Sequence, residues 1–205
     1  NRQPASHYVL VPRHSSENRA YIPCGFFDEN HIAADSCLAI PNATLYHFGM
    51  VTSAMHMAWV RYTCGRIKSD YRYSASIVYN NFPWPEIPPN PPFAKGGTTI
   101  AEGEATAPSN EAPPPLKKGG RGDLIEAAAQ AVLDARAQHP QSTLADLYNP
   151  NTMPDDLRAA HKALDKAVDA AYLADGGQKK WANDSERVAF LFRRYEALTS
   201  LLAGR

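Results

Sequence analysis

The sequence contains few cysteines, and their positions match neither a disulfide framework nor a zinc ribbon. Only three occur in 205 residues, Cys24, Cys37 and Cys64, and none stands in a CxxC spacing. An odd number without short pairing distances argues against both structures. We therefore expect reduced thiols, which behave in a protein core as small apolar side chains.

An excess of either charge is also absent, and so are long apolar runs. The 21 Lys and Arg residues are balanced by 21 Asp and Glu, which excludes a chain coated in positive charge but not a local basic patch. No apolar run approaches the ~20 residues of a membrane-spanning helix, and no charged-then-apolar leader opens the chain. We expect a soluble, cytoplasmic protein without a membrane partner. Because Asn1 is not an initiator Met and a strand-like segment follows at once, we expect the chain to be part of a longer one.

Motifs for catalysis and for metal binding are missing as well. The sequence has no GxSxG, no P-loop and no HxH or HExxH spacing among its seven histidines. The tetrapeptide NPPF, Asn90 to Phe93, has the composition with which amino-methyltransferases hold a flipped base. It lies in a low-complexity stretch, however, and no Gly-rich nucleotide loop precedes it. We predict no catalytic residue and no metal site.

Composition divides the chain into three zones: residues 1–86, 87–122 and 123–205. The first zone is rich in Tyr, Val and Ile, and the last is helical in pattern. The middle zone is rich in Pro and Gly with almost no large apolar residues, and such a composition is typical of a flexible linker or insertion. The predicted fold class is α+β: a partial mixed α/β domain, a linker, and a small α-helical bundle.

Short β-prone runs and one helical pattern alternate in the first zone. The helical pattern extends from Leu45 to Tyr62, with Thr44 placed to cap its start and Gly65 placed to end it. The runs bounded by turn-forming residues predict four strands, at Tyr8–Pro12, Tyr21–Phe26, Cys37–Pro41 and Ser76–Phe82.

Apolar residues recur every three to four positions in the last zone, which predicts a three- or four-helix bundle with a short extra turn at Leu144–Tyr148. The clearest apolar series contains Leu157, His161, Leu164, Val168 and Tyr172. Pro154 is placed to open this helix and Gly176 to follow it.

The densest polar cluster follows the first helix, in the segment Cys64–Ser74. Arg66, Lys68, Asp70 and Arg72 occupy every second position, so an extended chain would direct all four to one face. Lys or Arg donates to guanine O6 and N7, and Asp accepts from cytosine N4, so Lys68 and Asp70 could read one G·C pair. A solvated face with a local ion pair is the alternative.

A second polar cluster, PRHSSENRAYIP, joins two of the predicted strands. Its Arg13, Ser15, Ser16 and Arg19 are donor types that hold DNA phosphates and set the position of a protein on a duplex. A polar hairpin loop is the alternative. Arg61 and Arg66, at the end of the helix, could add phosphate contacts or complement the negative helix terminus.

Long segments of the sequence resemble the C-terminal part of MmeI-like enzymes. The segments include VLVPRHSSENRAYIPCGF, YHFGMVTSAMHMAWVR and YRYSASIVYNNFPWP, and the resemblance covers about residues 7–86 and 124–199. These are large bacterial single-chain DNA methyltransferases of type IIL restriction–modification, and many are also endonucleases. In that family a target recognition domain and a C-terminal helical domain follow an adenine-N6 methyltransferase that uses S-adenosylmethionine.

The resemblance implies a role for this chain and for individual residues. Lys68, Asp70 and Arg72 match positions that contact bases in such enzymes, and the helical domain would support the recognition domain and help to clamp the duplex. The partners would be double-stranded DNA and an upstream methyltransferase domain. S-adenosylmethionine would belong to the parent enzyme and no cofactor to this chain, which we expect neither to methylate nor to cut DNA by itself.

Two competing interpretations remain at this point. The chain could be a non-catalytic helical interaction module, or the remnant of a broken gene, with no function on DNA; the apolar patterns fit such a bundle equally well. An independent enzyme would require the chain alone to bind S-adenosylmethionine. Duplex binding with a steep salt dependence separates the DNA-recognition hypothesis from the interaction module.

Overall fold

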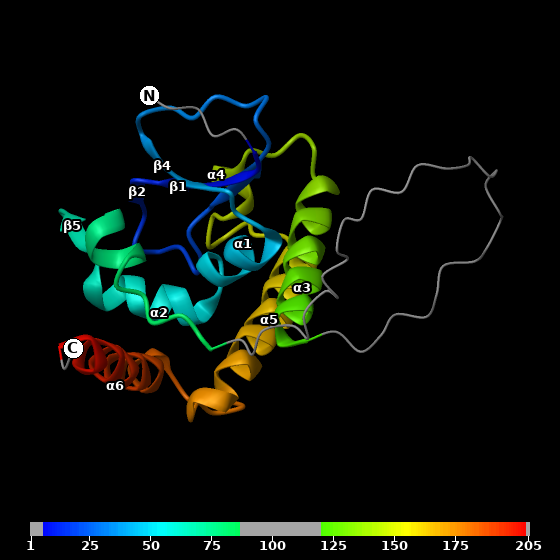
Figure 1. The fold of residues 1–205 in the computed structure, drawn as a ribbon. Helices are drawn as coiled ribbons and strands as arrows, with labels where there is room; N and C mark the ends of the chain where they lie inside the picture. The colour runs from blue at the N-terminus through cyan, green and yellow to red at the C-terminus, as the bar shows by residue number, and fades with distance from the viewer. Residues whose placement is uncertain (1–5, 87–119, 204–205) are drawn as a thin grey trace, which may run out of the picture.

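The computed structural model describes residues 6–86 and 120–203, and Figure 1 shows their arrangement. The predicted linker, apart from residues 120–122, and the NPPF segment lie outside the described residues. Small antiparallel sheets and helices make up residues 6–86, and residues 120–203 are helical, so the α+β prediction is confirmed. No helix within the two described ranges is both long and apolar enough to cross a membrane.

The first sheet is built around strand β1 (Tyr8–Pro12), which pairs antiparallel with β3 (Gly25–Phe27) and β4 (Cys37–Pro41). The predictions for β1 and β4 are confirmed residue for residue. Only Gly25 and Phe26 of the predicted strand Tyr21–Phe26 pair in the sheet. Tyr21, at its start, instead donates its hydroxyl to Asp165 of α5. Val9 stands opposite both Phe26 and Ile40, so the buried face of the sheet is continuous.

The second sheet consists of three very short antiparallel strands. Its order is β2 (His14–Ser15), β6 (Asp70–Arg72) and β5 (Gly65–Ile67). The strands β5 and β6 form a hairpin, and β2 brings the polar loop of the first zone beside it. The two polar clusters of the sequence therefore meet in one sheet.

The predicted single helix from Leu45 to Tyr62 is wrong in one respect: it is two helices, α1 (Leu45–Val51) and α2 (Ala54–Thr63). The break has a local cause. The Thr52 hydroxyl donates to the Phe48 carbonyl, 2.7 Å away, and the Ser53 hydroxyl caps the new helix by accepting from the His56 amide. The predicted cap at Thr44 is confirmed, and His47 completes a capping box there.

The predicted strand Ser76–Phe82 is also wrong, because this segment forms a single-turn π-helix, η1 (Ala75–Tyr79). Side chains, rather than a neighbouring strand, satisfy the carbonyl groups of Ser76, Ile77 and Val78. The Asn81 amide donates to the carbonyls of Ser76 and Ile77, and the Trp59 indole donates to that of Val78 at 3.0 Å. These partners come from the following residues and from α2, so a period-two pattern does not reveal them.

The C-terminal region contains three long helices, as the sequence predicts. They are α3 (Arg121–Ala137), α5 (Asp155–Ala171) and α6 (Asp184–Ala203), with the short α4 (Leu144–Leu147) and the 3₁₀ turn η2 (Tyr172–Asp175) between them. All five members of the Leu157 to Tyr172 series are fully buried. Gly176 ends η2 with a φ of 81°, a left-handed conformation that glycine adopts without strain.

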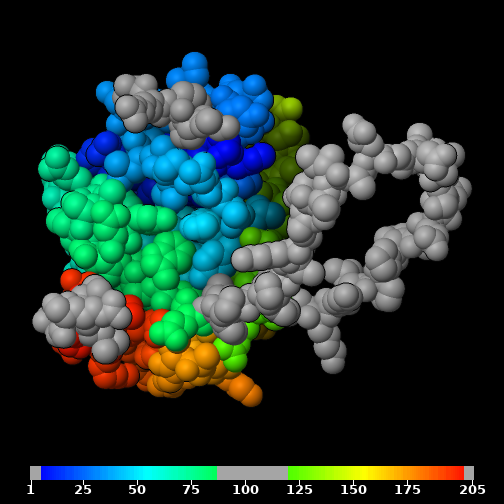
Figure 2. Space-filling model, viewed as in Figure 1, coloured from blue at the N-terminus to red at the C-terminus, as the bar shows by residue number. Residues whose placement is uncertain are grey.

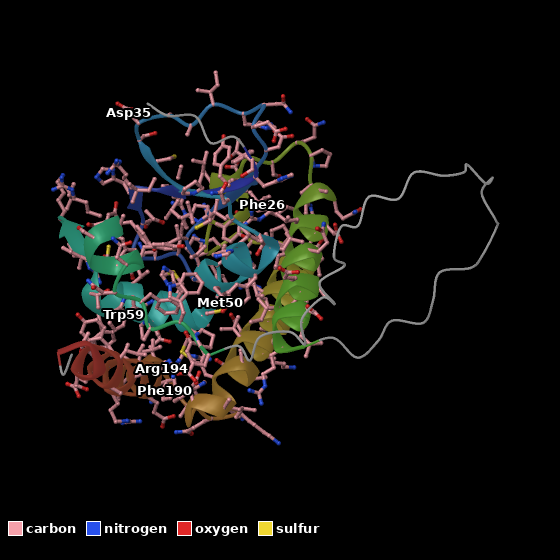
Figure 3. All side chains as sticks on the ribbon, viewed as in Figure 1. Phe26, Asp35, Met50, Trp59, Phe190 and Arg194 are labelled. Carbon is pink, nitrogen blue, oxygen red and sulfur yellow. The ribbon has the colours of Figure 1, made fainter. Side chains whose placement is uncertain are left out.

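One hydrophobic core joins residues 6–86 to the C-terminal helices. Helix α1 packs against α3 and α5 at Gly49, where a Cβ atom would lie 2.8 Å from Ile125 Cγ2. Helix α2 packs against α6, with the Trp59 ring centroid 5.0 Å from that of Phe192. Figure 2 shows the resulting broad contact between the two parts, and Met50, Trp59 and Phe190, labelled in Figure 3, are buried members of this shared core. The C-terminal helices thus pack directly on α1 and α2, the two helices of the first region.

Candidate nucleic-acid interface

The β5–β6 hairpin projects from the molecule with its polar side chains in solvent. All residues from Gly65 to Asp70 are exposed, and Ile67 pairs with Asp70 across the two-residue turn at Lys68 and Ser69. Lys68 has a φ of 56°, which is uncommon for a residue other than glycine. The reversal places Lys68 at the tip.

The hairpin changes which charged residues share a face. The expectation that Arg66, Lys68, Asp70 and Arg72 all point to one face is wrong, because the chain reverses at Lys68 instead of remaining extended. Cross-strand partners share a face, so Arg66 joins its partner Tyr71, and Asp70 and Arg72 lie on the opposite side. The Arg66 guanidinium stacks 4.4 Å from the Tyr71 ring centroid and donates to the Ser69 carbonyl at 2.7 Å.

Three of the predicted base readers remain together and accessible. Lys68 at the tip and Arg72 on the exposed face make no side-chain hydrogen bond or ion pair within residues 6–86 and 120–203. Asp70 accepts from the Glu17 amide at 3.2 Å, which ties the hairpin to the loop after β2. His14 pairs with Arg72 across the sheet and adds a further donor to that face. This face therefore carries unengaged cationic donors beside one carboxylate acceptor.

The segment around β2 contains four of the six predicted phosphate ligands: Arg13, Ser15, Ser16 and Arg19. Ser15 is 4% exposed and accepts weakly from Arg19 Nη1 at 3.5 Å, so it supports the loop from inside. Ser16 Oγ accepts from the Asn18 amide at 3.4 Å, and the Arg19 guanidinium makes no carboxylate contact in the described structure. Arg13 is exposed, and its Nε donates to the Asp35 carbonyl at 3.0 Å.

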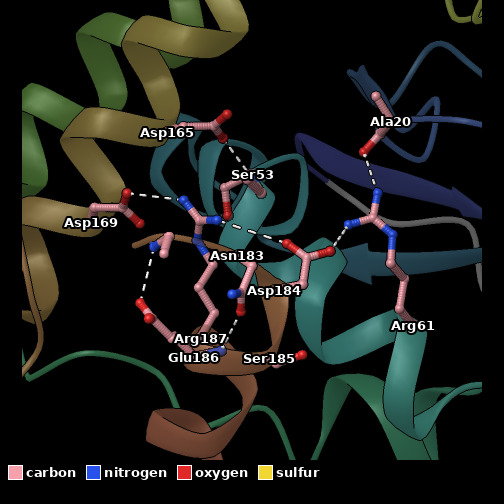
Figure 4. A network of polar contacts seen from close by, with 12 residues as sticks. Ala20, Ser53, Arg61, Asp165, Asp169, Asn183, Asp184, Ser185, Glu186 and Arg187 are labelled. Carbon is pink, nitrogen blue, oxygen red and sulfur yellow. Dashed lines mark hydrogen bonds and ion pairs between the residues drawn. The ribbon is translucent and has the colours of Figure 1, made fainter. Parts of the chain in front are cut away.

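Arg61 occupies a different environment from the other predicted phosphate ligands. Its guanidinium forms an ion pair with Asp184 at the start of α6 and donates to the Ala20 carbonyl at 3.3 Å (Figure 4). Asp184 in turn faces Arg187, and Arg187 pairs with Asp169 at 3.2 Å. Arg61 therefore links the polar loop to the C-terminal helices instead of standing free at the surface.

Asp165 holds the same loop from the helical side. Its carboxylate accepts from the Tyr21 hydroxyl at 2.7 Å and from the Ala54 amide at the start of α2 at 2.6 Å. Burial is the main cause that raises the pKa of Asp165 to about 6, and the two hydrogen bonds oppose it. The polar loop is thus fixed at Ala20 and Tyr21 by side chains that come from the other half of the molecule.

A buried neutral pair supports the hairpin from below. The Tyr73 hydroxyl lies 2.8 Å from His56 Nε2, and both side chains are buried. Burial raises the pKa of Tyr73 well above its usual value and lowers that of His56 to about 3. Both groups are neutral near pH 7, so they have a structural role and are poorly suited to proton transfer.

The structure adds candidate residues that the sequence interpretation missed. A pocket of about 590 Å³ adjoins the hairpin, and its polar lining combines cations with neutral donors: Arg13, Arg72, Ser74, Ser76 and Asn80. The expectation of a strand at Ser76–Phe82 concealed this grouping, because the π-helix brings Asn80 back beside Ser76. No cluster of three or more potential metal ligands is found among the described residues.

Comparisons with known proteins agree with this arrangement. Residues 1–86 match the family model for the MmeI target recognition domain, and residues 118–203 match that for the MmeI C-terminal domain. The chain is 36% identical, over 96% of its length, to DNA methyltransferase A of Bacillus subtilis (strain 168). It superimposes with a TM-score of 0.74 and 40% identity, over 97% of its length, on the Type IIL restriction-modification enzyme MmeI, solved in complex with DNA.

The chain spans only 18% of the first relative and 22% of the second. Both domain matches nevertheless fall on the two described regions, and the exposed hairpin lies within the first of them. The chain belongs to the MmeI family, of which it comprises a target recognition domain and a C-terminal domain.

Proposed function

We propose that this chain is the DNA sequence-recognition part of a bacterial site-specific adenine-N6 DNA methyltransferase of the restriction–modification type. The observation that carries the proposal is the exposed β5–β6 hairpin with Lys68 and Arg72 unengaged within the described residues. The major groove of B-DNA admits a two-stranded β-ribbon, so a hairpin of this kind can bring its tip to the base edges.

Each residue on the hairpin has a definite task in this proposal. Lys68 donates to O6 and N7 of a guanine, and Asp70 accepts from N4 of the paired cytosine. Asp70 is oriented for this by the Glu17 amide, and Arg72 adds a second donor on the same face. Arg13, Ser16 and Arg19 contact phosphates and set the position of the hairpin along the duplex.

Three of the expected phosphate ligands have other roles in the proposal. Arg66 stiffens the hairpin through its stacking on Tyr71 and its bond to Ser69. Arg61 orients the loop through Ala20. Ser15 is buried and supports Arg19.

The partner of this recognition unit in the proposal is a methyltransferase domain upstream in the same polypeptide. That domain would bind S-adenosylmethionine and carry the catalytic residues, and nuclease activity would also belong outside residues 1–205. Modification of chromosomal DNA takes place in the bacterial cytoplasm. The relative named DNA methyltransferase A supports this assignment.

Selection from a randomised duplex library tests the assignment of the base readers. The natural chain should enrich one sequence class, and the exchange Lys68→Asp with Asp70→Lys should change the preferred base at one position. A good base contact discriminates by ~1–3 kcal/mol, which gives roughly 5- to 150-fold enrichment. The control is Arg193→Glu with Glu196→Arg, an exchange of two exposed charges on α6. An identical preferred sequence for the natural and the hairpin-exchanged chains would contradict the assignment.

A further inference from the structure

We infer that a pocket shared by the two regions binds a phosphate of the DNA backbone, and that the C-terminal domain contacts DNA directly through Asn149 and Asn151. The pocket has a volume of about 500 Å³. Three of its lining residues come from the loop after β2 and three from the turn after α4: Ser16, Asn18, Arg19, Asn149, Pro150 and Asn151. The inference rests on the proposed function and extends the DNA contact beyond the target recognition domain.

The chemistry of the lining favours an anion. It contains one guanidinium, three carboxamides and one hydroxyl, and no carboxylate. The side-chain amides of Asn18 and Asn151 make no hydrogen bond to any part of the chain that the structure describes, and both residues are exposed. Arg, Asn and Ser side chains are all among the groups that hydrogen-bond to DNA phosphates.

Both walls of the pocket are fixed before any ligand binds. On one side, Asp165 holds Tyr21 and Arg61 holds Ala20, immediately after the lining residues. Figure 4 shows the contact between Arg61 and Ala20. On the other side, Asn149 Oδ1 accepts from the Asn151 amide at 3.0 Å, and the Asn149 carbonyl accepts from the Met153 amide at 2.9 Å. These contacts hold the backbone on both sides of the pocket, so less conformational entropy is lost when its side chains bind a ligand.

The turn after α4 is itself anchored by a buried network. Tyr148, which directly precedes Asn149, receives a hydrogen bond from Arg136 Nε at 2.9 Å and lies 2.6 Å from His161 Nε2. Arg136 Nη1 also donates to the Cys24 carbonyl at 2.8 Å, which connects this turn to the recognition domain. The position of Asn149 is thus set by both regions.

The pocket adjoins the candidate reading hairpin. The Glu17 amide, within the lining loop, donates to Asp70, and Arg19 contacts Ser15, which pairs with Tyr71 in the sheet. A duplex whose base edges meet Lys68 and Asp70 would therefore pass its backbone near this loop. The occupant we assign is a phosphate of that same duplex.

Two opposite substitutions test the inference in the full 205-residue chain. Asn151→Arg should add one phosphate contact, steepening the log–log salt dependence of duplex binding by about 0.9. The ratio of the variant's affinity to that of the natural chain should be roughly eightfold higher at 0.1 M salt than at 1 M, and the same for all duplex sequences. Asn151→Asp should weaken binding by a similar factor, and Gln178→Glu, an exposed change of the same charge far along the chain, should leave it unchanged. Because Asn151→Arg predicts a gain, a folding defect cannot imitate the result.

The possible outcomes separate this inference from the proposed function. Steep salt dependence in the natural chain with no change in either Asn151 variant would overturn the inference and leave the hairpin assignment intact. A natural chain that binds no duplex would overturn both. Inorganic phosphate at constant ionic strength provides a further test. If Asn151→Asp weakens the binding of inorganic phosphate but leaves duplex binding unchanged, the pocket holds free phosphate, which contradicts a DNA contact.

Discussion

The two regions of the chain use their charged residues in different ways. In the C-terminal helices two arginines with little exposure pair with carboxylates: Arg187 with Asp169 at 3.2 Å, and Arg194 with Asp175 at 3.0 Å. Their side chains are only 14% and 10% exposed. On the hairpin, Lys68 and Arg72 are exposed and have no such partner within the described residues.

The difference shows why composition alone says little about DNA binding in this chain. The overall charge is zero, with 21 residues of each sign. Paired charges inside the helical region orient elements of the fold and contribute little to the external field. Unpaired charges at the hairpin remain available to an anionic ligand. Whether each charged residue has a partner therefore indicates more about DNA binding than the net charge does.

Loss of the packing contact between the two regions should cause the largest loss of stability. Trp59 is 2% exposed, packs against Phe192 and Tyr195 of α6, and donates to the Val78 carbonyl. We expect Trp59→Ala to lower the free energy of unfolding by about 3–5 kcal/mol, measured in urea. Phe192→Ala, at the half-exposed edge of the same contact, should cost less. Separate unfolding transitions for the two regions in the natural chain would contradict a shared core.

A second prediction concerns the loss of stability in acid, which depends on buried titratable groups in both regions. Burial lowers the pKa of His56 and of His161 to about 3, whereas Asp165 is raised to about 6. Between pH 6 and 4 the unfolded chain therefore binds two protons at the histidines, and the folded chain binds one at Asp165. The difference is one proton, so stability should fall by about 1.4 kcal/mol per pH unit on acidification from these groups.

Asp165→Asn isolates the contribution of the residue that joins the regions. Without its carboxyl the proton difference becomes two, so the acid slope should increase to about 2.7 kcal/mol per pH unit. Urea unfolding at half-unit pH steps measures both slopes. Asp123→Asn, at an exposed position at the start of α3, serves as the matched control. A slope that Asp165→Asn leaves unchanged would contradict the raised pKa.

The close approach of α1 to the C-terminal helices gives a third, smaller expectation. A Cβ at Gly49 would lie 2.8 Å from Ile125 Cγ2, 3.1 Å from Ala129 Cβ and 3.2 Å from Leu164 Cδ1. Gly49→Ala should therefore destabilise the chain by about 1–2 kcal/mol, since overpacking outweighs the gain in helix propensity. At Gly65 the nearest atom is 3.8 Å away, and Gly65→Ala should change stability by less than about 0.5 kcal/mol. Equal effects at both positions would show that the helices can separate.

The smallest expected effect is on the salt dependence of duplex binding. It should distinguish an arginine that contacts a phosphate from an arginine that only supports the fold. Arg19→Ala should reduce the log–log salt slope of duplex binding by about 0.9 without changing sequence preference. Arg61 is engaged with Asp184 and Ala20, so Arg61→Ala should lower stability and leave the slope unchanged. Fluorescence titrations between 0.05 and about 0.3 M salt measure the slopes. A larger slope change for Arg61→Ala than for Arg19→Ala would reverse the two assignments.

These helices and strands were predictable from the sequence because the apolar residues of each recur with one fixed spacing. The five residues of one apolar series follow the helical repeat and all are buried: Leu157, His161, Leu164, Val168 and Tyr172. The strands β1 and β4 end where turn-forming residues begin. The break at Thr52 and Ser53 was missed because hydroxyl groups interrupt the helix without disturbing its apolar pattern.

The candidate site was only partly predictable, because contacts distant in sequence decide its geometry. Lys68 adopts a positive φ although it is not glycine, and this single reversal moves Arg66 to the opposite face. The pocket residues Asn149 and Asn151 are separated from Arg19 by about 130 positions and belong to no recognisable motif. Sequence identified the charged segment, but not which of its members act together.

Backbone amide hydrogen exchange, with and without saturating duplex DNA, tests most directly the claim that the hairpin contacts DNA while the ion-paired helices support it. The account predicts protection at residues 65–72 and 14–19, with the helix residues 155–203 unchanged. Protection confined to α5 and α6, with the hairpin exchanging as it does in the free chain, would contradict it.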